Sequence, residues 1–248
     1  MLQSISPNIR INHNNALSFS GKFQVLQSLF GERFHIPRAV HDARRCSKRI
    51  EVQLTSGEVE GGNVVYLENG KFLGVNHYFE NPYEIFGVGK YVLKKDTYEL
   101  ELGKMIESSH RLDLAITESH AKGVRDLSRS LPIKIADRSP YINDTVYIIG
   151  SNGHWEGQKA IPATVLSKSR KLPPAIDSSA GTEANYYEIK SAILYKHRDK
   201  FSAPGLSGSP VVNKKGELVG VAADSYPNDW SKFNVIDLNT IKTFLSTH

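Results

Sequence analysis

Short apolar runs separated by turn-forming residues fill most of the chain after residue 50. Asn69-Gly70 lies between two such runs, and Asn-Gly is a strong signal for a tight hairpin turn. Lys214-Lys215-Gly216 predicts a second hairpin loop, because its glycine can adopt a positive φ. The predicted strands cover 50–54, 63–67, 71–75, 91–93, 98–102, 112–116, 145–150, 160–166, 186–189, 209–213, 217–223 and 233–236. Many short strands with few helices indicate an antiparallel all-β barrel or sandwich.

Helical spacing occurs near both ends of the chain. Apolar residues at 25, 26, 29 and 30 would share one face of a helix that Gly31 could end. The stretch 238–245 predicts a terminal helix with Asn239 or Thr240 near its N-cap. Between the first helix and the first clear strand lies the basic stretch 38–49, which we interpret as a solvated linker in preference to a binding patch.

The chain is long enough to bury a real core. It has 248 residues, of which 40% are hydrophobic and 23% are charged, and all-β folds of this length are commonly single units. The net charge of +5 permits an acidic partner without demanding nucleic acid. Cys46 is the only cysteine in the sequence, so neither an intrachain disulfide nor a cysteine-based zinc cluster can form.

Targeting signals are not evident in the sequence. No apolar run approaches the ~20 residues that a membrane-spanning helix needs, and the first residues lack the basic-then-apolar layout of a signal peptide. We therefore expect a cytoplasmic protein, or one exported by a route without an N-terminal signal peptide. No pattern predicts an oligomeric state.

A lone serine, Ser207, lies between Gly205 and Gly208 just before an apolar run. The glycines would allow a sharp bend and a close approach of the backbone to a ligand, although a tight turn without chemistry would have the same pattern. A serine nucleophile needs an imidazole to accept its proton and a carboxylate to orient that imidazole.

His77 and Asp113 have the contexts that such a mechanism needs. His77 follows the apolar run 72–75 and leads into a loop, which suits a catalytic base as well as an ordinary loop histidine. Asp113 interrupts an otherwise apolar strand, where a buried carboxylate requires a hydrogen-bond or charged partner. Asp96, by contrast, lies among lysines and is interpreted as solvated.

Several segments resemble the chymotrypsin-fold (trypsin-like) serine proteases, and their pattern is closest to the HtrA/Deg-like peptidases. GLSGSPVVNKKGELVGV resembles the nucleophile segment of that fold, FLGVNHYF the strand that ends in Asn-His, and RLDLAITE the segment with Asp-Leu-Ala. NDTVYIIGSNG and AIPATVLSKSR are similar to strands of the second barrel. The resemblance covers residues 50 to 248, and its His, Asp, Ser order differs from the orders of subtilisins and α/β-hydrolases.

The resemblance implies an all-β, chymotrypsin-like fold with two six-stranded antiparallel β-barrels and a C-terminal helix. A protease domain would occupy 50–248, divided between the barrels at about 120–140, after an N-terminal extension at 1–49. The implied activity is serine endopeptidase cleavage of a protein or peptide substrate. His77, Asp113 and Ser207 would form the catalytic triad, and the N–H groups of Gly205 and Ser207 would form the oxyanion hole.

Departures from the family pattern refine these expectations. Ser209 replaces the second glycine of the usual Gly-x-Ser-Gly-Gly-Pro motif, as in glutamyl endopeptidase-like members, and the chain ends without a predicted PDZ domain. Leu206 stands where trypsin-like zymogens have an aspartate that receives a newly cut N-terminus, so we expect no trypsin-style activation by N-terminal processing. The substrate pocket would be lined by residues at two places in the chain, namely Phe201 and Ala222, Ala223 and Asp224.

These pocket residues favour a small or apolar substrate side chain. Phe201 supplies no carboxylate for a trypsin-like preference, and the histidine of glutamyl endopeptidases is missing, although Asp224 would favour a basic residue if it faced inward. No metal-binding motif or phosphate-binding loop occurs, so neither a metal nor another cofactor is expected. The alternative function is a catalytically silent scaffold that binds a peptide or nucleic acid. Retention of all three chemical groups argues against it.

Overall fold

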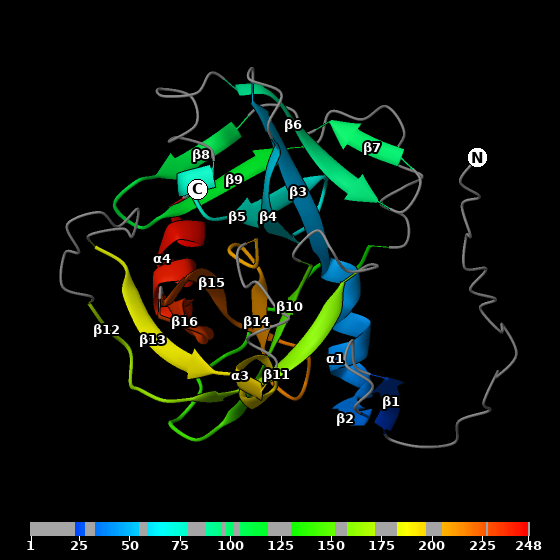
Figure 1. The fold of residues 1–248 in the computed structure, drawn as a ribbon. Coiled ribbons are helices and arrows are strands. Elements are labelled where there is room, and N and C mark those ends of the chain that lie inside the picture. Colours follow the sequence, from blue (N-terminus) through cyan, green and yellow to red (C-terminus); the bar gives the residue numbers. More distant parts are fainter. Residues whose placement is uncertain are drawn as a thin grey trace, which may run out of the picture.

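Two antiparallel sheets dominate the computed structural model of the chain, with the first sheet above the second in Figure 1. The structure describes residues 23–27, 33–54, 59–78, 88–95, 98–101, 105–118, 130–151, 158–171, 183–196, 205–226 and 228–247. The predicted all-β class is confirmed.

The first sheet is built from strands in the first half of the chain. They are β3 (Ser47–Leu54), β4 (Val59–Tyr66), β5 (Lys71–Gly74), β6 (Val88–Lys95), β7 (Tyr98–Glu101), β8 (Met105–Ser109) and β9 (Leu114–Glu118). Their order is β7-β6-β3-β4-β5-β9-β8. The predicted Asn69-Gly70 turn joins β4 to β5, and both of its residues have positive φ, 51° and 79°.

The second sheet closes on itself through pairing of β11 with β13. Its strands are β10 (Thr145–Gly150), β11 (Lys159–Val165), β12 (Arg170–Lys171), β13 (Asn185–Lys190), β14 (Pro210–Val212), β15 (Leu218–Tyr226) and β16 (Asp229–Asp237). The order is β11-β10-β14-β15-β16-β13-β12, so all but β12 form a closed six-stranded barrel. A short helix, α3 (Ala192–Lys196), follows β13.

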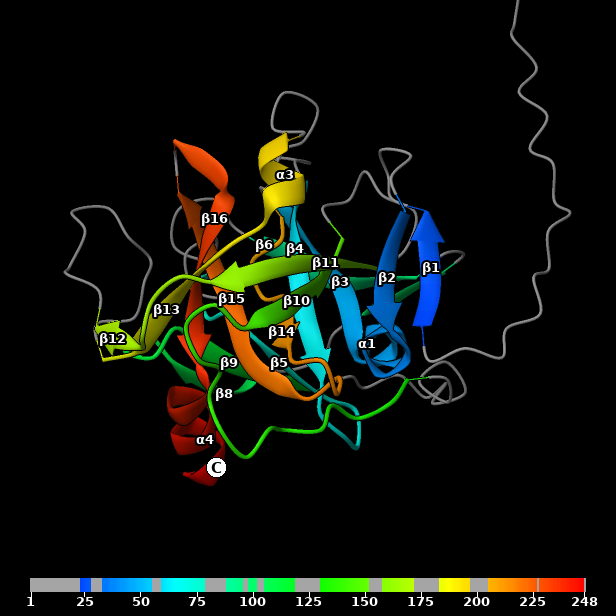
Figure 2. The same cartoon turned by 90° about the horizontal axis from the view of Figure 1, so that it is seen from below.

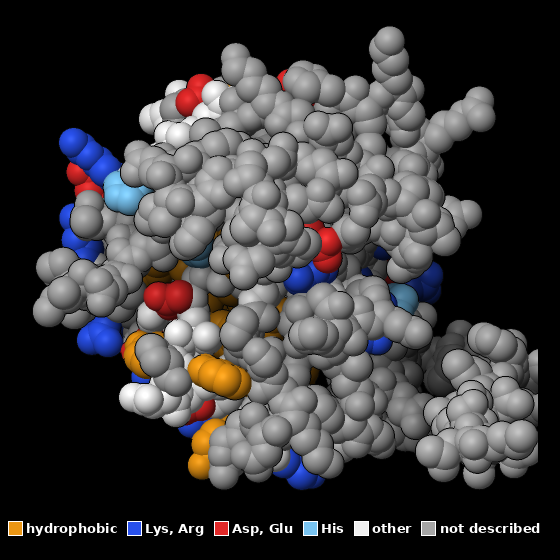
Figure 3. Space-filling view, turned by 45° about the horizontal axis from the view of Figure 1, so that its top comes forward, with side chains coloured by type: hydrophobic (Ala, Val, Ile, Leu, Met, Phe, Trp, Pro, Cys, Tyr) orange, Lys and Arg blue, Asp and Glu red, His pale blue; other side chains and the backbone are white. Residues whose placement is uncertain are grey.

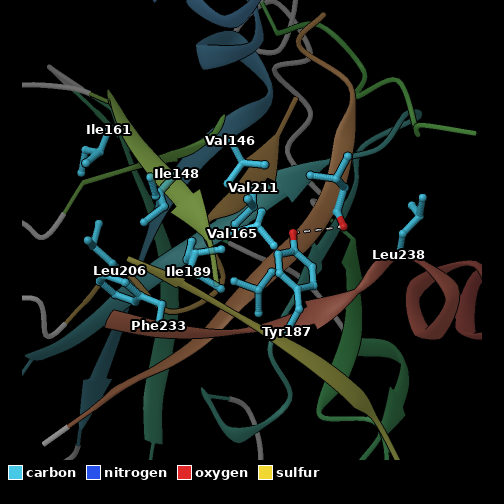
Figure 4. Close-up of a cluster of buried hydrophobic side chains, with 14 of the residues drawn as sticks. Val146, Ile148, Ile161, Val165, Tyr187, Ile189, Leu206, Val211, Phe233 and Leu238 are labelled. Carbon is cyan, nitrogen blue, oxygen red and sulfur yellow. Dashed lines mark hydrogen bonds between the residues drawn. The ribbon is translucent and has the colours of Figure 1, made fainter. Parts of the chain in front are cut away.

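One hydrophobic cluster fills this barrel and another joins the two sheets. In the barrel, Ile148, Ile189, Val211 and Phe233 converge, and the Tyr187 hydroxyl donates to the Val219 carbonyl oxygen at 3.3 Å (Figure 4). The second cluster combines residues of the first sheet, of the second sheet and of the C-terminal helix α4 (Leu238–Ser246), including Val65, Leu73, Leu114, Tyr186, Val221, Ile236 and Phe244. This shared core holds the sheets together, because separating them would expose its apolar surface to water.

The N-terminal region differs from the sequence-based prediction. The helix expected around residues 23–31 is wrong: β1 (Phe23–Gln27) pairs with β2 (Arg33–Pro37) as an antiparallel hairpin, which lies beside α1 (Arg38–Ala43) in Figure 2. Apolar spacing in so short a run does not separate helix from strand, and pairing with a later segment decided the outcome.

The solvated linker expected at 38–49 is also wrong. The stretch forms α1, the short 3-10 helix η1 (Arg44–Cys46) and the start of β3. Val40, Ala43 and Cys46 are buried against Ile149 and Val212 of the second sheet. Val40, Ala43 and Cys46 are spaced three residues apart and so share one apolar face, although basic residues lie between them in the sequence.

The C-terminal helix α4 (Leu238–Ser246) is confirmed, but its cap lies earlier than predicted. Asp237, rather than Asn239 or Thr240, is the N-cap, and its Oδ1 accepts a hydrogen bond from the Thr240 N–H at 2.8 Å. A carboxylate at this position satisfies one of the free N–H groups of the first turn. In Figure 1, α4 lies next to the first sheet, consistent with Ile241 and Phe244 in the shared core.

Candidate active site

His77 and Asp113 are in direct contact. The His77 Nδ1 atom lies 3.0 Å from Asp113 Oδ1 and 2.9 Å from Oδ2, and the His77 backbone N–H donates to Oδ1 at 2.9 Å. The Asp113 side chain is 1% exposed and that of His77 is 16% exposed. A buried carboxylate is therefore bonded to one ring nitrogen of a histidine that solvent still reaches.

Local backbone geometry positions this pair. The sequence analysis predicted Asp113 within a strand, but it lies in the turn before β9, with φ at 51°. Gly74 pairs with Ala115, which brings the end of β5 next to the start of β9. The Asn76 N–H then donates to the Asp113 carbonyl oxygen at 3.2 Å. Asparagine and aspartate tolerate the left-handed region better than most residues, so the sequence suits this turn.

Ser207 lies in a tight turn between two glycines with positive φ. Gly205 has φ at 91° and Gly208 at 78°. The Gly208 N–H donates to the Ala222 carbonyl oxygen at 2.7 Å, and the Ala222 N–H donates to the Ser209 carbonyl oxygen at 2.9 Å. These two bonds fix the turn to β15.

The two parts meet at Gly62 of β4. A Cβ atom on Gly62 would lie 2.4 Å from the Tyr78 ring and 3.0 Å from the Ser207 carbonyl oxygen. Tyr78 adjoins His77, and the centroids of the two rings are 4.8 Å apart. Only the backbone of Gly62 therefore lies between the histidine segment and the serine turn. The approach is this close because glycine has no side chain.

The turn around Ser207 carries backbone N–H groups that have no acceptor among the described residues. Within the described part of the chain, neither the Gly205 N–H nor the Ser207 N–H makes a hydrogen bond. Leu206, between them, is fully buried. Two N–H groups on either side of an anchored side chain are suited to binding a negatively charged oxygen.

The predicted pocket residues have different environments. Phe201 lies outside the described residues. Ala222 and Ala223 are buried in the barrel cluster and in the shared cluster, respectively. Asp224 is half-buried, and Asn234 Nδ2 donates to its Oδ1 at 2.8 Å.

Asp224 also interacts with the histidine pair. The pKa of its carboxyl is raised, chiefly because the group is buried and further because of the negative Asp113. The hydrogen bond from Asn234 and the attraction of His77 act in the opposite direction. Asp224 is thus a second carboxylate close enough to influence His77.

Sequence reasoning missed Asn63, which contacts the serine turn from β4. Asn63 is fully buried, its N–H donates to the Ser207 carbonyl oxygen at 2.8 Å, and its Nδ2 donates to the Gly205 carbonyl oxygen at 2.8 Å. Its signal in the sequence is a lone amide between Gly61-Gly62 and an apolar run. Such a residue at a core position needs internal hydrogen-bond partners.

Neither a metal cluster nor a spanning helix is found where the structure is described. No three His, Cys, Asp or Glu side chains in the described ranges are grouped to bind a metal ion. Among the helices described here, none has the length and apolar character needed to cross a bilayer. On the face shown in Figure 3, described side chains of both charge signs are visible, together with hydrophobic ones.

Comparison with solved structures shows the fold. The Rv3671c protease from M. tuberculosis, active form, has a TM-score of 0.65 and 14% identity, with 94% of this chain and 92% of that chain covered. HtrA-type protease AlgW with tripeptide has a TM-score of 0.62 and 18% identity, covering 84% of this chain and 60% of that one. The serine endoprotease from Yersinia pestis has a TM-score of 0.60 and 19% identity, covering 85% and 65%.

These similarities confirm the chymotrypsin-like architecture expected from the sequence. No curated protein sequence matches the chain at a significant level. A family model described as a trypsin-like peptidase domain matches residues 34–221, a range that contains His77, Asp113 and Ser207. The match begins within the stretch expected to be an N-terminal extension. The chain belongs to the trypsin-like peptidase domain family.

Proposed function

We propose that this protein is a serine endopeptidase that hydrolyses peptide bonds through an acyl-enzyme intermediate. The observation that carries the proposal is the contact of His77 Nδ1 with the buried Asp113 carboxylate, at 2.9 Å. A carboxylate in this position holds the imidazole in the tautomer whose other nitrogen can accept a proton. The histidine segment lies close to the Ser207 turn, on the other side of Gly62, which supports a triad of His77, Asp113 and Ser207.

The chemistry follows from these roles. Ser207 Oγ attacks the carbonyl carbon of the scissile bond while His77 Nε2 accepts its proton. His77 then protonates the leaving amine as the C–N bond breaks, which leaves an ester on Ser207. Water attacks that ester with the same proton transfers, so the enzyme returns to its starting state. The N–H groups of Gly205 and Ser207 stabilise the negative oxygen of each tetrahedral intermediate.

The substrate binds as an extended strand along β15. Pairing between β14 and β15 ends at Val221, and among the described strands residues 224–226 of β15 pair with β16 alone. The other edge of this segment offers backbone groups to a peptide, which is a common recognition mode. The segment begins beside Ala222, whose backbone is bonded to the serine turn, so a peptide added here would reach Ser207.

A fluorophosphonate probe tests this function against the non-catalytic scaffold. The parent protein should be labelled covalently, and Ser207→Ala should not. Ser209→Ala should still be labelled, because the Ser209 side chain is fully buried beside Gly150. A folded parent protein that takes no label, and that cleaves no member of a peptide library, would contradict the proposal.

A further inference from the structure

Asn63 occupies the boundary between the two sheets. It belongs to β4 of the first sheet, and β4 contacts β14 of the second, as both cartoon views show (Figures 1 and 2). Its side chain is fully buried. A buried amide must find partners for one acceptor and two donor hydrogens, so its contacts define its position closely.

The backbone of Asn63 is bonded to the serine turn. Its N–H donates to the Ser207 carbonyl oxygen at 2.8 Å. Its own carbonyl oxygen lies against Gly208, where an added Cβ would approach to 1.8 Å. The turn therefore rests directly on the Asn63 main chain.

The side chain of Asn63 makes a second connection to the same turn. Nδ2 donates to the Gly205 carbonyl oxygen at 2.8 Å and to the Ser151 carbonyl oxygen at 3.1 Å. Oδ1 accepts from the Ser151 N–H at 3.0 Å. Arg49 Nη1 also donates to the Ser151 carbonyl oxygen, at 3.0 Å, which helps to fix the position of Ser151. The amide is thus fully satisfied, and each partner limits its rotation.

All three carbonyl groups of the turn 205–207 are engaged. Asn63 holds those of Gly205 and Ser207, and the Leu206 carbonyl oxygen accepts from the Ser209 N–H at 3.1 Å. A planar trans peptide points its N–H opposite to its C=O, so fixing the Leu206 carbonyl also fixes the direction of the Ser207 N–H. Gly205 has the widest conformational freedom of any residue type, and the Asn63 amide removes part of that freedom.

We propose that Asn63 is the positioning residue of the oxyanion hole: from the first sheet it holds, through their carbonyl groups, both residues whose N–H groups bind the oxyanion. The inference rests on the proposed serine endopeptidase function. Asparagine suits the role because aspartate offers only acceptors and serine is too short to reach the same partners.

Asn63→Asp in the full chain tests this role. The carboxylate keeps the acceptor for the Ser151 N–H but loses both Nδ2 hydrogen bonds. Loss of one oxyanion donor lowers kcat by about 10²- to 10³-fold, so a misplaced turn should lower kcat by at least about tenfold. KM for a peptide substrate should change less than about threefold. A peptidyl boronate, which forms a tetrahedral adduct, should lose at least as much affinity as kcat loses rate, while a product peptide should bind normally.

Asn213→Asp is the matched control. Asn213 also uses its amide in several hydrogen bonds, with Lys215 and Glu217, but in the hairpin loop after β14. It should leave kcat and boronate affinity within about twofold of the parent values. Asn63→Ser gives a second, uncharged variant and should show the same selective loss.

The outcomes separate this inference from the proposed function. A parent protein without labelling or cleavage would refute the function itself. If the parent is active and the Asn63 variants fold, two results would overturn the positioning role while the function stood. One is an equal loss of affinity for the product peptide and the boronate, and the other is no loss of affinity for either. Failure of both Asn63 variants to fold would assign Asn63 to the stability of the fold and would likewise overturn the role.

Discussion

The His77 ring and the Asp113 carboxylate are joined side chain to side chain and also through the His77 backbone N–H. The carboxylate thus orients both the imidazole and the chain that carries it. Because Asp113 is buried, its charge is poorly solvated and depends on these partners.

Asp113→Asn should therefore lower kcat by about 10⁴-fold while changing KM little, because the amide would stabilise the wrong imidazole tautomer. Steady-state kinetics on a cleaved peptide measure the effect. Asp137→Asn is the control, since Asp137 is exposed and interacts with Lys242 through its backbone carbonyl. A variant of Asp113 with parental kcat would remove this residue from the mechanism.

Gly208→Ala should destabilise the protein by more than about 3 kcal/mol, a loss typical of severe backbone and packing conflicts. The new methyl group would meet the Asn63 carbonyl oxygen at 1.8 Å, and φ at 78° disfavours any side chain. Urea unfolding followed by circular dichroism gives the free energy. Gly70→Ala, at a hairpin turn with φ at 79°, should lose only about 1–2 kcal/mol from the left-handed backbone. Equal losses in the two variants would contradict the steric explanation.

Cys46 should not react with thiol reagents in the native protein at pH 8. Burial raises the pKa of its thiol to about 12, and Sγ donates to the Ala43 carbonyl oxygen. The thiolate is the reactive form, so the native protein should give less than about one tenth of the absorbance change that the urea-unfolded protein gives with Ellman's reagent. Rapid stoichiometric reaction without urea would show that α1 and η1 do not cover Cys46.

Asp224→Asn should stabilise the folded state at neutral pH. Burial raises the pKa of the Asp224 carboxyl, so the folded state binds its proton more tightly and stability falls as pH rises from the unfolded to the folded pKa. The variant does not lose stability in this way, so its free energy of unfolding should exceed that of the parent at neutral pH. The two should be equal near pH 3. Thermal unfolding from pH 3 to 8 measures the difference.

Asp229→Asn provides a control of opposite sign. Burial acts to raise the pKa of this carboxyl, but hydrogen bonds from Lys190 and Ser231 lower it overall. Asp229→Asn should be destabilising at neutral pH and without effect near pH 3. If both variants changed the stability at neutral pH in the same direction, the opposite pKa changes given for Asp224 and Asp229 would be refuted.

Asp224 should also affect the pH dependence of catalysis. Its attraction to His77 stabilises the imidazolium form. Removing the charge should move the acidic limb of the kcat/KM profile to lower pH, because the general base then loses its proton more easily. A limb that stays in place would show that Asp224 does not influence the base.

Local pattern was sufficient for most of the strands and for the chemical groups of the site. The alternation of apolar runs and turn residues predicted β10, β13 and β15 closely, and the Asn69-Gly70 signal placed its hairpin correctly. Local pattern failed at β1 and β2, where the pairing of these two neighbouring segments as a hairpin outweighed apparent helical spacing. It also placed Asp113 within a strand, because apolar neighbours do not reveal a turn with positive φ.

The sequence by itself determined the fold class, the family resemblance and the order of His77, Asp113 and Ser207, because periodicity, turn residues and motif order are properties of the chain. Only the tertiary structure decided which atoms meet. The contact of Asp113 with His77, the contact of both segments at Gly62 and the hold of Asn63 on Gly205 and Ser207 all join residues far apart in sequence. Sheet closure and burial create such contacts, and a local window of sequence contains neither.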